Sequence, residues 1–410
     1  MIQGGRMKRI FALFLVMAVL GASSGAQDAE SLILTYQRNF VRSSLGTKLE
    51  LLRAASAEAA QAAEANRSVD MGPLYDTALR FVVENVALLG TDAQLREVAN
   101  TASIKAGEVG YAKSVERLWS VFELYPRDQE LRAVALMAFA KVGKTEARVV
   151  ERLNTFLSGQ TSLFRSGAQP EYPALAACID ALGNLGDGSS FPFLFSAYVA
   201  GFNKEISVKA IDALGKIQGD YEAYLKDVIT RNSPLEKAAA LEAGLSNPKF
   251  GFLERGALSE AALAAGLDRP AGDSPVELAS IRELKLRAVR EIKALGRQKA
   301  SPLVIRHFRN LLTEYNEGRA PEAELLEAIS CLGAMGSIEA AQSLALYLQL
   351  INARTEQGGA YDEDILLAVI SSLGELGDKT AFDYLLYIGY LQYPESVKRA
   401  AKDALQRLKW

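Results

Sequence analysis

The side chains best suited to catalysis are scarce in this sequence. It holds one histidine, His307, and two cysteines, Cys178 and Cys331. A serine or cysteine nucleophile is normally activated by a neighbouring base, so His307 would have to serve in any such pair. His307 lies between two arginines in an amphipathic pattern, which favours a solvated or half-buried position on a helix. We therefore predict that the protein is not an enzyme.

Metal and cofactor chemistry also lacks its usual residues. A structural zinc site takes four donors, usually Cys and His, and one histidine with two cysteines supplies too few. The sequence has no phosphate-binding loop and no Gly-rich dinucleotide turn. We predict no metal site and no cofactor. Each cysteine lies in an apolar helical pattern, which favours burial as a small hydrophobic residue over a disulfide or a reactive thiol.

Charge and length limit the remaining functions. The chain has 410 residues, with 46 Lys and Arg against 49 Asp and Glu, and a formal net charge of −3. A balance this close to neutral gives no general attraction to nucleic acid or to an anionic membrane. The length suits two or three ordinary domains or one elongated array. We expect a protein that acts by binding, with no nucleic acid partner.

The first 26 residues have the pattern of a secretory signal peptide. Lys8 and Arg9 precede the apolar run Ile10–Leu20, and Ser24 and Ala26 have the spacing of a small-x-small cleavage site. The run is shorter than the roughly 20 residues that span a bilayer, and no later stretch is long and apolar enough. We predict cleavage of residues 1–26 and an exported mature chain, periplasmic or otherwise extracytoplasmic, with no integral membrane segment. The alternative is an uncleaved membrane anchor.

The elements that must carry any binding surface repeat along the rest of the chain. An Ala-rich apolar pattern ends six times in an apolar residue followed by glycine, at Val142-Gly143, Leu182-Gly183, Leu214-Gly215, Leu295-Gly296, Leu332-Gly333 and Leu373-Gly374. By subtraction, neighbouring pairs lie 40, 32, 81, 37 and 41 residues apart. The longest interval is about two periods, with a degenerate unit near residues 241–245. A period of roughly 30–45 residues is typical of a solenoid of helix pairs.

Each repeat is predicted to hold two helices with their own start and stop signals. Small alanines allow the first helix to approach its neighbours closely, and the glycine is expected to end that helix in the left-handed conformation. Aspartates at the N-cap position are expected to start second helices at Asp187, Asp220 and Asp378. Capping boxes with Pro at the first helical position are predicted at Ser233 and Ser274.

The segments Asp187–Tyr198 and Val397–Leu408 resemble the two halves of a HEAT-like repeat of the variety first noted in phycobilin lyases. In that family an Asp opens the second helix, a Pro often follows five residues on, and a Leu two residues later. Asp187, Pro192 and Leu194 match this pattern. Other repeats depart from it, since Asp383 stands at the Pro position and Arg297 at the Asp position.

The resemblance covers roughly Met71–Leu408 and carries expectations about the fold. It implies an all-α, right-handed superhelical solenoid of about seven or eight HEAT-like helix pairs, with the second helices lining the concave face. Some enzymes of related folds use several His-Glu pairs, which one histidine rules out. Others act on DNA through a basic concave face, and the export signal and the slightly acidic charge balance argue against that activity. The resemblance is therefore informative about the fold and says little about function.

Two regions depart from the repeat. Residues 27–70 are helical in composition and end in a polar break, so we predict an N-terminal helical cap before a solenoid over residues 71–410. Residues 245–275 are rich in Gly and Pro, which predicts a long loop around one short helix, Leu258–Leu267. Such a loop is either a functional protrusion or a decayed repeat.

Aromatic residues concentrate in the predicted second helices, where most of them should fill the core opposite the alanines. The Pro/Leu register predicts these inward-facing residues: Phe191, Leu194, Phe195, Phe382 and Leu385. The same register leaves Phe193, Tyr384 and Tyr387 facing the groove. Because aromatic rings, Tyr above all, are enriched at recognition surfaces, these three are candidate partner-binding residues.

The charges are distributed unevenly near the C-terminal half. Ile281–Asn310 carries nine Lys and Arg residues and two Glu, a local charge of +7 by subtraction, and Glu317–Asp364 is mostly acidic. The first interpretation is a solvated helix face whose basic charges pair with this neighbouring acidic repeat. The alternative is a docking patch for an acidic partner, with Arg306 as the candidate residue.

These observations favour a non-catalytic periplasmic scaffold or adaptor that binds a protein of the cell envelope through the concave face of the solenoid. The alternative is a binder of cell-wall glycan or of a small ligand, with tyrosines of the groove stacking on sugar rings. A deep pocket walled by Tyr and Trp would favour the glycan. A basic groove with few exposed rings would favour an acidic protein.

Overall fold

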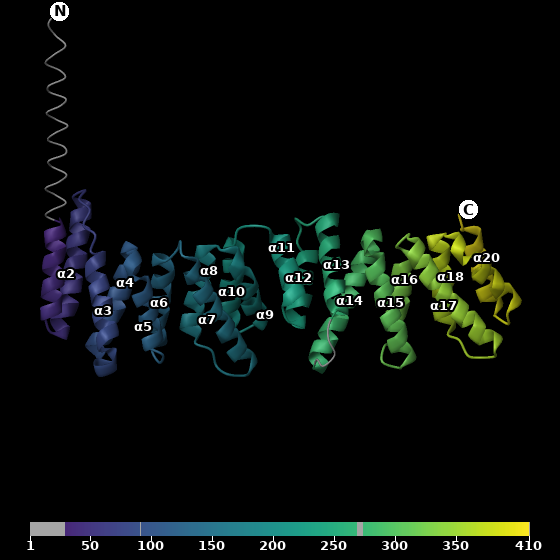
Figure 1. Ribbon diagram of the computed structural model, residues 1–410, viewed down its shortest axis with the longest axis horizontal. Coiled ribbons are helices and arrows are strands. Elements are labelled where there is room, and N and C mark those ends of the chain that lie inside the picture. Colours follow the sequence, from purple (N-terminus) through teal and green to yellow (C-terminus); the bar gives the residue numbers. More distant parts are fainter. Residues whose placement is uncertain (1–28, 91, 269–273, 410) are drawn as a thin grey trace, which may run out of the picture. The chain divides into compact units, whose positions relative to one another are not determined.

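The computed structural model describes residues 29–90, 92–268 and 274–409, and these are almost entirely helical, with no strand among them (Figure 1). This confirms the all-α fold class. The predicted signal peptide lies outside the described residues, as do residues 269–273 of the predicted loop. Among the described helices, none is both long enough and apolar enough to cross a membrane.

The chain divides into two compact units, residues 1–219 and residues 220–410. Residues 29–42 of unit 1 are helical. They are followed by α2 (Leu45–Glu64), α3 (Gly72–Leu89), α4 (Ala93–Val109), η1 (Ala112–Ser114), α5 (Val115–Leu124), α6 (Gln129–Val142), α7 (Ala147–Arg165), α8 (Tyr172–Leu185), η2 (Gly188–Ser190), α9 (Phe191–Ala200) and α10 (Lys204–Lys216).

Unit 2 continues the same succession of helices. Its described elements are α11 (Tyr221–Arg231), α12 (Pro234–Leu245), α13 (Phe252–Leu267), α14 (Pro275–Leu295), η3 (Gln298–Ala300), α15 (Ser301–Asn316), α16 (Glu322–Gly333), α17 (Ile338–Glu356), α18 (Glu363–Leu376), η4 (Lys379–Ala381), α19 (Phe382–Tyr387), η5 (Ile388–Tyr390) and α20 (Glu395–Gln406).

The helices of each unit form two layers. In unit 1, α4 packs against α2 and α6, and α8 packs against α6 and α10. In unit 2, α14 packs against α12 and α16, and α18 packs against α16 and α20. We call these even-numbered helices the even layer and the odd-numbered helices the odd layer. Each odd helix from α3 to α19 also packs against the even helix that follows it, so the repeating element is a helix pair.

Small residues bring helices of the even layer close together. A Cβ atom added to Gly183 of α8 would lie 2.8 Å from the Cβ of Ala213 in α10. A Cβ atom added to Gly374 of α18 would lie 3.1 Å from the Cβ of Ala404 in α20. These distances confirm that small side chains permit the close approach of neighbouring first helices.

The same glycines do not end their helices in the left-handed conformation, so that expectation is wrong. Gly183 and Gly374 lie inside α8 and α18, which continue to the caps Gly186, at φ 66°, and Gly377, at φ 67°. Among the six glycines of the repeated pattern, only Gly296 has a positive φ, 57°. Gly183 and Gly374 allow close packing of the next helix, and Gly186 and Gly377 allow the left-handed backbone at the helix end. A residue without Cβ suits both positions.

The predicted helix starts are present. Asp187 and Asp378 accept hydrogen bonds from the backbone N–H groups two residues on, at 2.8 and 2.9 Å. Asp220 accepts from the N–H of Ala223 at 3.1 Å. Ser233 and Ser274 form capping boxes at α12 and α14. The aspartates at 187 and 378 cap the short helices η2 and η4, which lead into α9 and α19.

The segment predicted as a long loop is mostly a helix. The helix within it, α13, spans Phe252–Leu267 and packs against α11, α12 and α14, with α12 in the even layer and α13 in the odd layer. Its glycines are not turn residues: a Cβ at Gly256 would lie 2.6 Å from Nε of Arg297, and one at Gly266 would lie 2.7 Å from Cγ of Lys285. They make room for the long side chains of Lys285 in α14 and of Arg297 after it, so the described part of this segment packs as a helix of unit 2.

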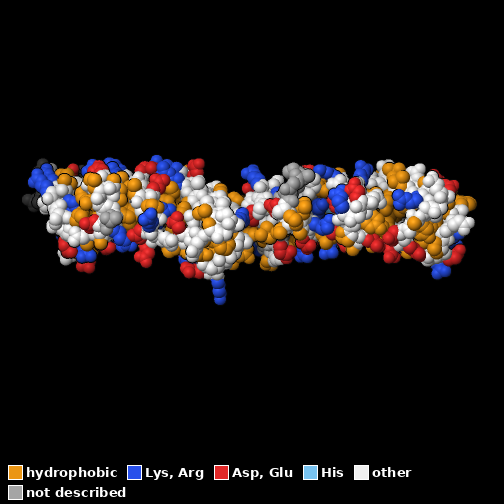
Figure 2. Space-filling view, turned by 90° about the horizontal axis from the view of Figure 1, so that it is seen from below, with side chains coloured by type: hydrophobic (Ala, Val, Ile, Leu, Met, Phe, Trp, Pro, Cys, Tyr) orange, Lys and Arg blue, Asp and Glu red, His pale blue; other side chains and the backbone are white. Residues whose placement is uncertain are grey.

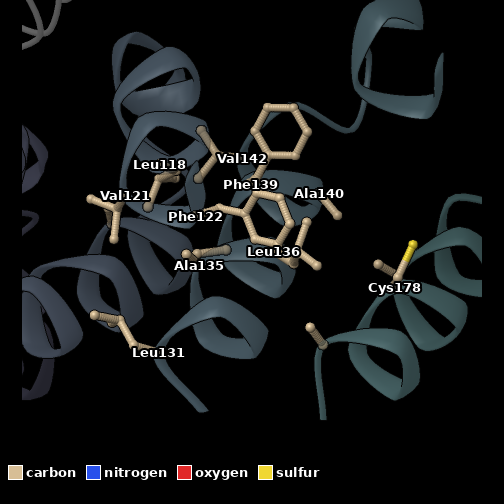
Figure 3. Packing of buried hydrophobic residues seen from close by; sticks show 14 of the residues in the cluster. Leu118, Val121, Phe122, Leu131, Ala135, Leu136, Phe139, Ala140, Val142 and Cys178 are labelled. Atoms are coloured by element: carbon tan, nitrogen blue, oxygen red, sulfur yellow. The ribbon is translucent and has the colours of Figure 1, made fainter. Parts of the chain in front are cut away.

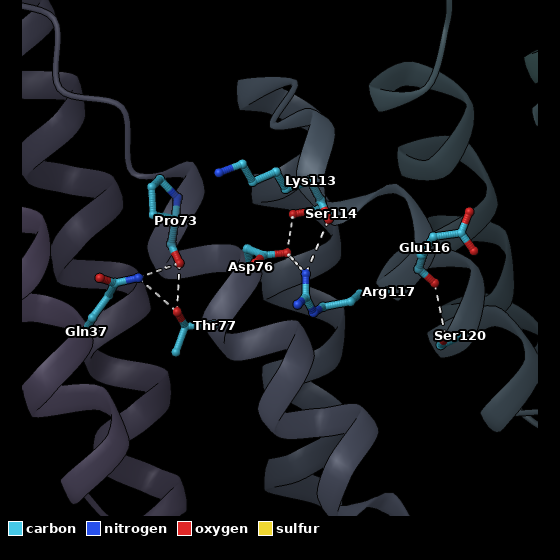
Figure 4. Close-up of polar contacts among 9 residues, drawn as sticks. All are labelled: Gln37, Pro73, Asp76, Thr77, Lys113, Ser114, Glu116, Arg117 and Ser120. Carbon is cyan, nitrogen blue, oxygen red and sulfur yellow. Dashed lines mark hydrogen bonds and ion pairs between the residues drawn. The ribbon is translucent and has the colours of Figure 1, made fainter. Parts of the chain in front are cut away.

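Polar contacts join the first described helix to α3 and α3 to α5 (Figure 4). The Nε2 of Gln37 donates to the carbonyl of Pro73 and to Oγ1 of Thr77, both at 2.9 Å. The carboxylate of Asp76 accepts from Ser114 at 3.1 Å and from Arg117 at 2.6 Å. The N-terminal residues thus extend the packing of unit 1.

The core lies between the two layers, and more of its buried rings come from the odd layer than from the even layer. Figure 3 shows Phe122 of α5 beside Leu136 and Phe139 of α6, all three buried. Trp119 lies 4.9 Å from Phe122 and 5.1 Å from Phe139 between ring centroids. Cys178 is fully buried in α8.

Candidate partner-binding surfaces

The two candidate tyrosines lie on α19, the last helix of the odd layer. Tyr387 is 39% exposed, and its hydroxyl donates to Oε1 of Glu356 in α17 at 2.8 Å. This hydrogen bond raises the pKa of Tyr387. Tyr384 is half-buried, and its backbone carbonyl accepts from the side chain of Asn352 at 3.1 Å. Tyr387 therefore presents its ring to solvent in a fixed orientation, and Tyr384 does so only in part.

Other exposed hydrophobic residues lie near Tyr387 in sequence, on α19 and η5, and on the neighbouring helix α17. On α19 and η5, Leu386 is 42% exposed and Tyr390 78% exposed. On α17, which packs against α19, Leu346 and Leu350 are 54% and 65% exposed and lie one turn apart. We call Leu346, Leu350, Leu386, Tyr387 and Tyr390 the α17–α19 surface. Interaction sites gather several exposed apolar residues, whereas single ones are common on any surface.

Phe193 belongs to a different unit from the tyrosines. It lies on α9 of unit 1, where it is half-buried against the hydrophobic core. The inward register holds around it, since Phe191, Leu194 and Phe195 are all buried. In unit 2 the register also buries Leu385, although Phe382 is half-buried. Phe193 therefore lies between the core and the surface.

Arg306 is engaged within unit 2. Its Nη1 lies 2.5 Å from Oδ1 of Asp268, and its Nη2 donates to the carbonyl of Leu267 at 3.1 Å. These contacts join α15 to the C-terminal end of α13. The carbonyl is one of the last in that helix, where a cation is favourably placed. Arg306 holds two repeats together and is less available to a partner than its sequence context indicates.

The basic segment is largely paired within unit 2, and about half of its pairs are with the neighbouring acidic repeat that the first interpretation names. The ion pairs are Arg282 with Glu324, Arg287 with Glu242, Arg290 and Lys293 with Glu327, Arg297 with Glu260, and Arg306 with Asp268. The acidic partners come from α16 on one side and from α12 and α13 on the other. Figure 2 likewise shows basic and acidic side chains interspersed on the face in view. Most of these pairs are exposed, so each contributes little to stability.

The histidine and the two cysteines are buried, which makes them poorly suited to catalysis. His307 is 4% exposed, which corrects the expectation of a solvated or half-buried position. It shares the buried stripe of α15 with Val304 and Leu311, three and four residues away. Burial, followed by the nearby charge of Lys285, lowers the pKa of His307 to about 3. At neutral pH it is an uncharged core residue.

Both cysteines are free and buried, which confirms that interpretation for these described residues. Burial raises the pKa of Cys178, and it raises the pKa of Cys331 to about 12. Their thiols lie 3.4 Å and 3.6 Å from the backbone carbonyls of Leu153 and Val289. Neither sulfur is a thiolate at neutral pH, so neither has the reactive form.

Three carboxylates in unit 2 lie close enough to hold a cation. Oxygens of Glu322, Asp362 and Asp364 lie within 4.8 Å of one another. Capping explains the position of Asp362, whose Oδ1 accepts from the N–H groups of Asp364 and Ile365 at 3.0 and 3.1 Å at the start of α18. Capping accounts for Asp362, and we assign the cluster no ligand.

A depression in the even layer of unit 1 is the second surface with the character of a binding site. It has a volume of about 710 Å³ and lies over α4, α6 and α8. We call it the even-layer groove. It is lined by Ile104, Gly107, Glu108, Ala133, Val134, Met137, Ala138, Ala140, Lys141, Lys144, Ala177, Ala181, Asn184 and Leu185. Ile104 and Met137 are 39% and 38% exposed.

Sequence reasoning missed this groove because it placed recognition on the second helices. The groove lies on the first helices, whose small residues were assigned to helix packing alone. The available signal was an apolar residue off the buried stripe of each helix, Ile104 in α4 and Met137 in α6. Single exposed apolar residues are common, so that signal alone was weak.

Comparisons with known proteins assign no function to these surfaces. No family model matches the chain, and no curated protein matches it. The resemblance to HEAT-like repeats therefore stays a prediction drawn from the residues.

Proposed function

We propose that this protein is a non-catalytic scaffold or adaptor of the cell envelope, built as a right-handed solenoid of about seven or eight HEAT-like helix pairs. The α17–α19 surface carries this proposal, because it combines exposed leucines with two exposed tyrosines on helices whose opposite faces are buried. Leu385 and Leu348, both buried, anchor α19 and α17 beneath it. A large rigid ring on a fixed helix loses little entropy when a partner covers it.

The chemistry of the even-layer groove supports a protein partner over the alternative of a glycan. A site for sugar would present Tyr or Trp faces and polar groups to the hydroxyls of the ligand. The groove lining is mainly aliphatic and includes no aromatic residue. The buried state of His307, Cys178 and Cys331 supports the proposal that the protein is not an enzyme.

The test uses a partner captured from the envelope by affinity purification and identified by mass spectrometry. The double variant Tyr387→Ala/Tyr390→Ala should weaken binding of that partner at least tenfold, about 1.4 kcal/mol, while its melting temperature stays close to that of the parent. The matched control is Tyr387→Phe, which keeps the ring and loses the hydrogen bond to Glu356. It should bind like the parent if the ring makes the contact.

Two outcomes would count against the proposal. Unchanged binding by the alanine variant would place the interface elsewhere. Retention of the parent and of the Tyr387→Phe variant on purified cell-wall glycan, together with loss of retention in the alanine variant, would favour the glycan alternative.

We also propose that the chain is exported and cleaved near Ala26, on the pattern of Lys8, Arg9 and Ile10–Leu20. N-terminal sequencing of the envelope-localised protein should find a mature chain that starts near Gln27. A protein that still begins at Met1 or Met7 would contradict cleavage and favour the anchor.

A further inference from the structure

We propose that the even-layer groove of unit 1 binds an amphipathic helix of a partner protein, with carboxylates beside its apolar face. This site lies in a different unit and a different layer from the α17–α19 surface, so it goes beyond the function proposed above. It gives the protein a second, chemically distinct docking surface.

The groove follows from the way even helices pack. A Cβ added to Gly107 of α4 would lie 3.0 Å from the Cβ of Ala138 in α6, so these helices meet nearly backbone to backbone. Ala181 of α8 is another small residue in the lining. Residues this small leave the surface above the contact hollow. Ile104 and Met137 stand beside it and supply exposed apolar side chains.

The lining selects an apolar occupant. Its residues from α4, α6 and α8 are mostly Ala, Val, Ile, Leu and Met, and the polar ones are Glu108, Lys141, Lys144 and Asn184. A volume of about 710 Å³ lies in the usual range for binding sites, roughly 300–1,000 Å³, and is enough for several apolar side chains. Met137 adds adaptability, since methionine side chains adjust to different apolar surfaces.

The charges at the rim select acidic residues. Glu108 is occupied by Lys105, at 2.7 Å, and Asn184 accepts from Lys216 at 2.9 Å. Lys141 and Lys144 are both exposed, and no ion pair joins either of them to a carboxylate within the described residues. The rim therefore offers two available positive charges to a partner. Their complement is a helix with Glu or Asp flanking its apolar stripe.

The openness of the groove favours a helix over a lipid chain. Ile104 and Met137 each keep more than a third of their surface in water, so the even-layer groove is open to solvent. An acyl chain lying in it would leave much of its own surface hydrated. An amphipathic helix buries one face through anchors at i, i+3, i+4 and i+7 and keeps the other face in water.

The test measures the binding of two fluorescein-labelled helical peptides of about 15 residues by anisotropy, using the full mature chain. Both peptides carry leucines at i, i+3, i+4 and i+7. One has flanking glutamates and the other has lysines at the same positions. At low salt the glutamate peptide should bind at least tenfold more tightly than the lysine peptide.

Two variants of the groove should change this result in different ways. Ile104→Gln/Met137→Gln should weaken the glutamate peptide at least tenfold, because the apolar walls are lost. Lys141→Glu/Lys144→Glu should reverse the preference between the two peptides. The matched controls are Leu163→Gln, an exposed leucine on α7 of the odd layer, and Lys113→Glu, an exposed lysine of η1. Neither control should alter binding, and thermal melts should show that all variants stay folded.

Several results would overturn the proposal. These are equal binding of the two peptides, equal loss in the groove and control variants, or no binding of the glutamate peptide. Retention on phosphatidylglycerol vesicles that only the groove variants lose would assign the groove to a lipid surface. Self-association in sedimentation that the Gln pair abolishes would assign it to a second copy of the chain. The Tyr387→Ala/Tyr390→Ala protein should bind the peptide normally, so failure of one surface is distinguishable from failure of the other.

Discussion

Neighbouring helices make one kind of contact in the even layer and a different kind in the odd layer. In the even layer, neighbouring helices meet through small residues, as at Gly183 and Ala213. In the odd layer, large rings fill the space between neighbours: Phe122 of α5 lies 5.2 Å from Phe156 of α7, measured between ring centroids. In unit 2, Phe308 of α15 likewise lies 5.6 Å from Tyr347 of α17.

This difference predicts how each layer responds to mutation. Where helices of the even layer meet through a glycine, as at Gly183, there is no room for an added carbon. The odd layer depends on the rings that are present. The same difference locates the two candidate surfaces, because small residues leave a furrow in the even layer and rings stand exposed at the end of the odd layer.

The largest expected effect is at Gly183. In Gly183→Val, the added Cβ would lie 2.8 Å from both Cα and Cβ of Ala213, so α8 and α10 must separate. We expect a loss of about 3 kcal/mol in the free energy of unfolding, at the upper end for an overpacked core. Urea denaturation measures it.

The control for this prediction is Gly159→Ala in α7 of the odd layer. Nothing lies within 4 Å of a Cβ at this position, and the glycine is inside a helix. The substitution should raise stability by about 0.5–1 kcal/mol through helix propensity. A Gly183→Val protein as stable as the parent would show that the even layer is not closely packed.

A smaller loss is expected at Arg132, which joins the layers. Its Nη1 donates to the carbonyl of Phe122 at 2.8 Å, its Nε lies 2.7 Å from Oε2 of Glu171, and its guanidinium lies 3.8 Å from the ring centroid of Phe122. In Arg132→Met, the carbonyl and the half-buried carboxylate lose their partner. We expect a loss of about 2–3 kcal/mol.

The control for Arg132 is Arg148→Met, since Arg148 forms only exposed ion pairs with Glu116 and Glu146. That variant should unfold at nearly the same urea concentration as the parent, because exposed ion pairs contribute little to stability. Equal effects of the two substitutions in urea denaturation would show that the contacts of Arg132 with Phe122 and Glu171 stabilise the fold no more than exposed ion pairs do.

The pH dependence of stability reports on the odd layer, where His307 is buried. Its folded pKa is lowered to about 3, below the value near 6.5 of an exposed histidine. Below pH 6.5 the unfolded chain binds a proton that the folded chain does not, so stability falls as pH falls. His307 should remove about 2 kcal/mol between pH 7 and pH 5.

The variant His307→Gln isolates this contribution, because the carboxylates titrate alike in both proteins. The difference in unfolding free energy between parent and variant should change by that amount over the same pH interval. A difference that is constant with pH would show that the histidine is exposed.

The smallest expected effect is at Arg306. Its ion pair with Asp268 is about half exposed, with side-chain exposures of 49% and 64%. Arg306→Ala should lower stability by no more than about 0.5–1 kcal/mol, and the loss should shrink at 1 M salt, where exposed charges are screened. A loss above 2 kcal/mol, or one that salt leaves unchanged, would contradict the view that this contact is mainly a surface ion pair.

The sequence was sufficient to predict the helix starts and much of the inward register, because local signals determine them. Asp187, Asp220 and Asp378 cap helices as expected, and the inward register buries Phe191 and Leu194. The two roles of glycine were not separable in sequence, since a packing glycine and a turn glycine look alike. Gly183 and Gly186 are distinguished only by their tertiary contacts and φ angles.

The candidate surfaces were harder to predict, because exposure depends on neighbouring repeats. Periodicity placed Tyr387 at the surface, where the structure has it. It could not show that Arg306 is paired with Asp268 or that His307 is buried, since both depend on packing between helices. The even-layer groove spans three helices from separate repeats, and no single stretch of sequence contains it.

Amide hydrogen exchange of the mature chain, alone and with its captured envelope partner at saturation, locates the binding surface on the folded protein. We predict slower exchange in the bound state over Phe382–Tyr390 and over the turn of α17 that holds Leu346 and Leu350. The helix α18 of the even layer, which lies outside both proposed surfaces, should exchange equally in both states. Unchanged exchange at the α17–α19 surface, with protection confined to other segments, would contradict the proposed binding site.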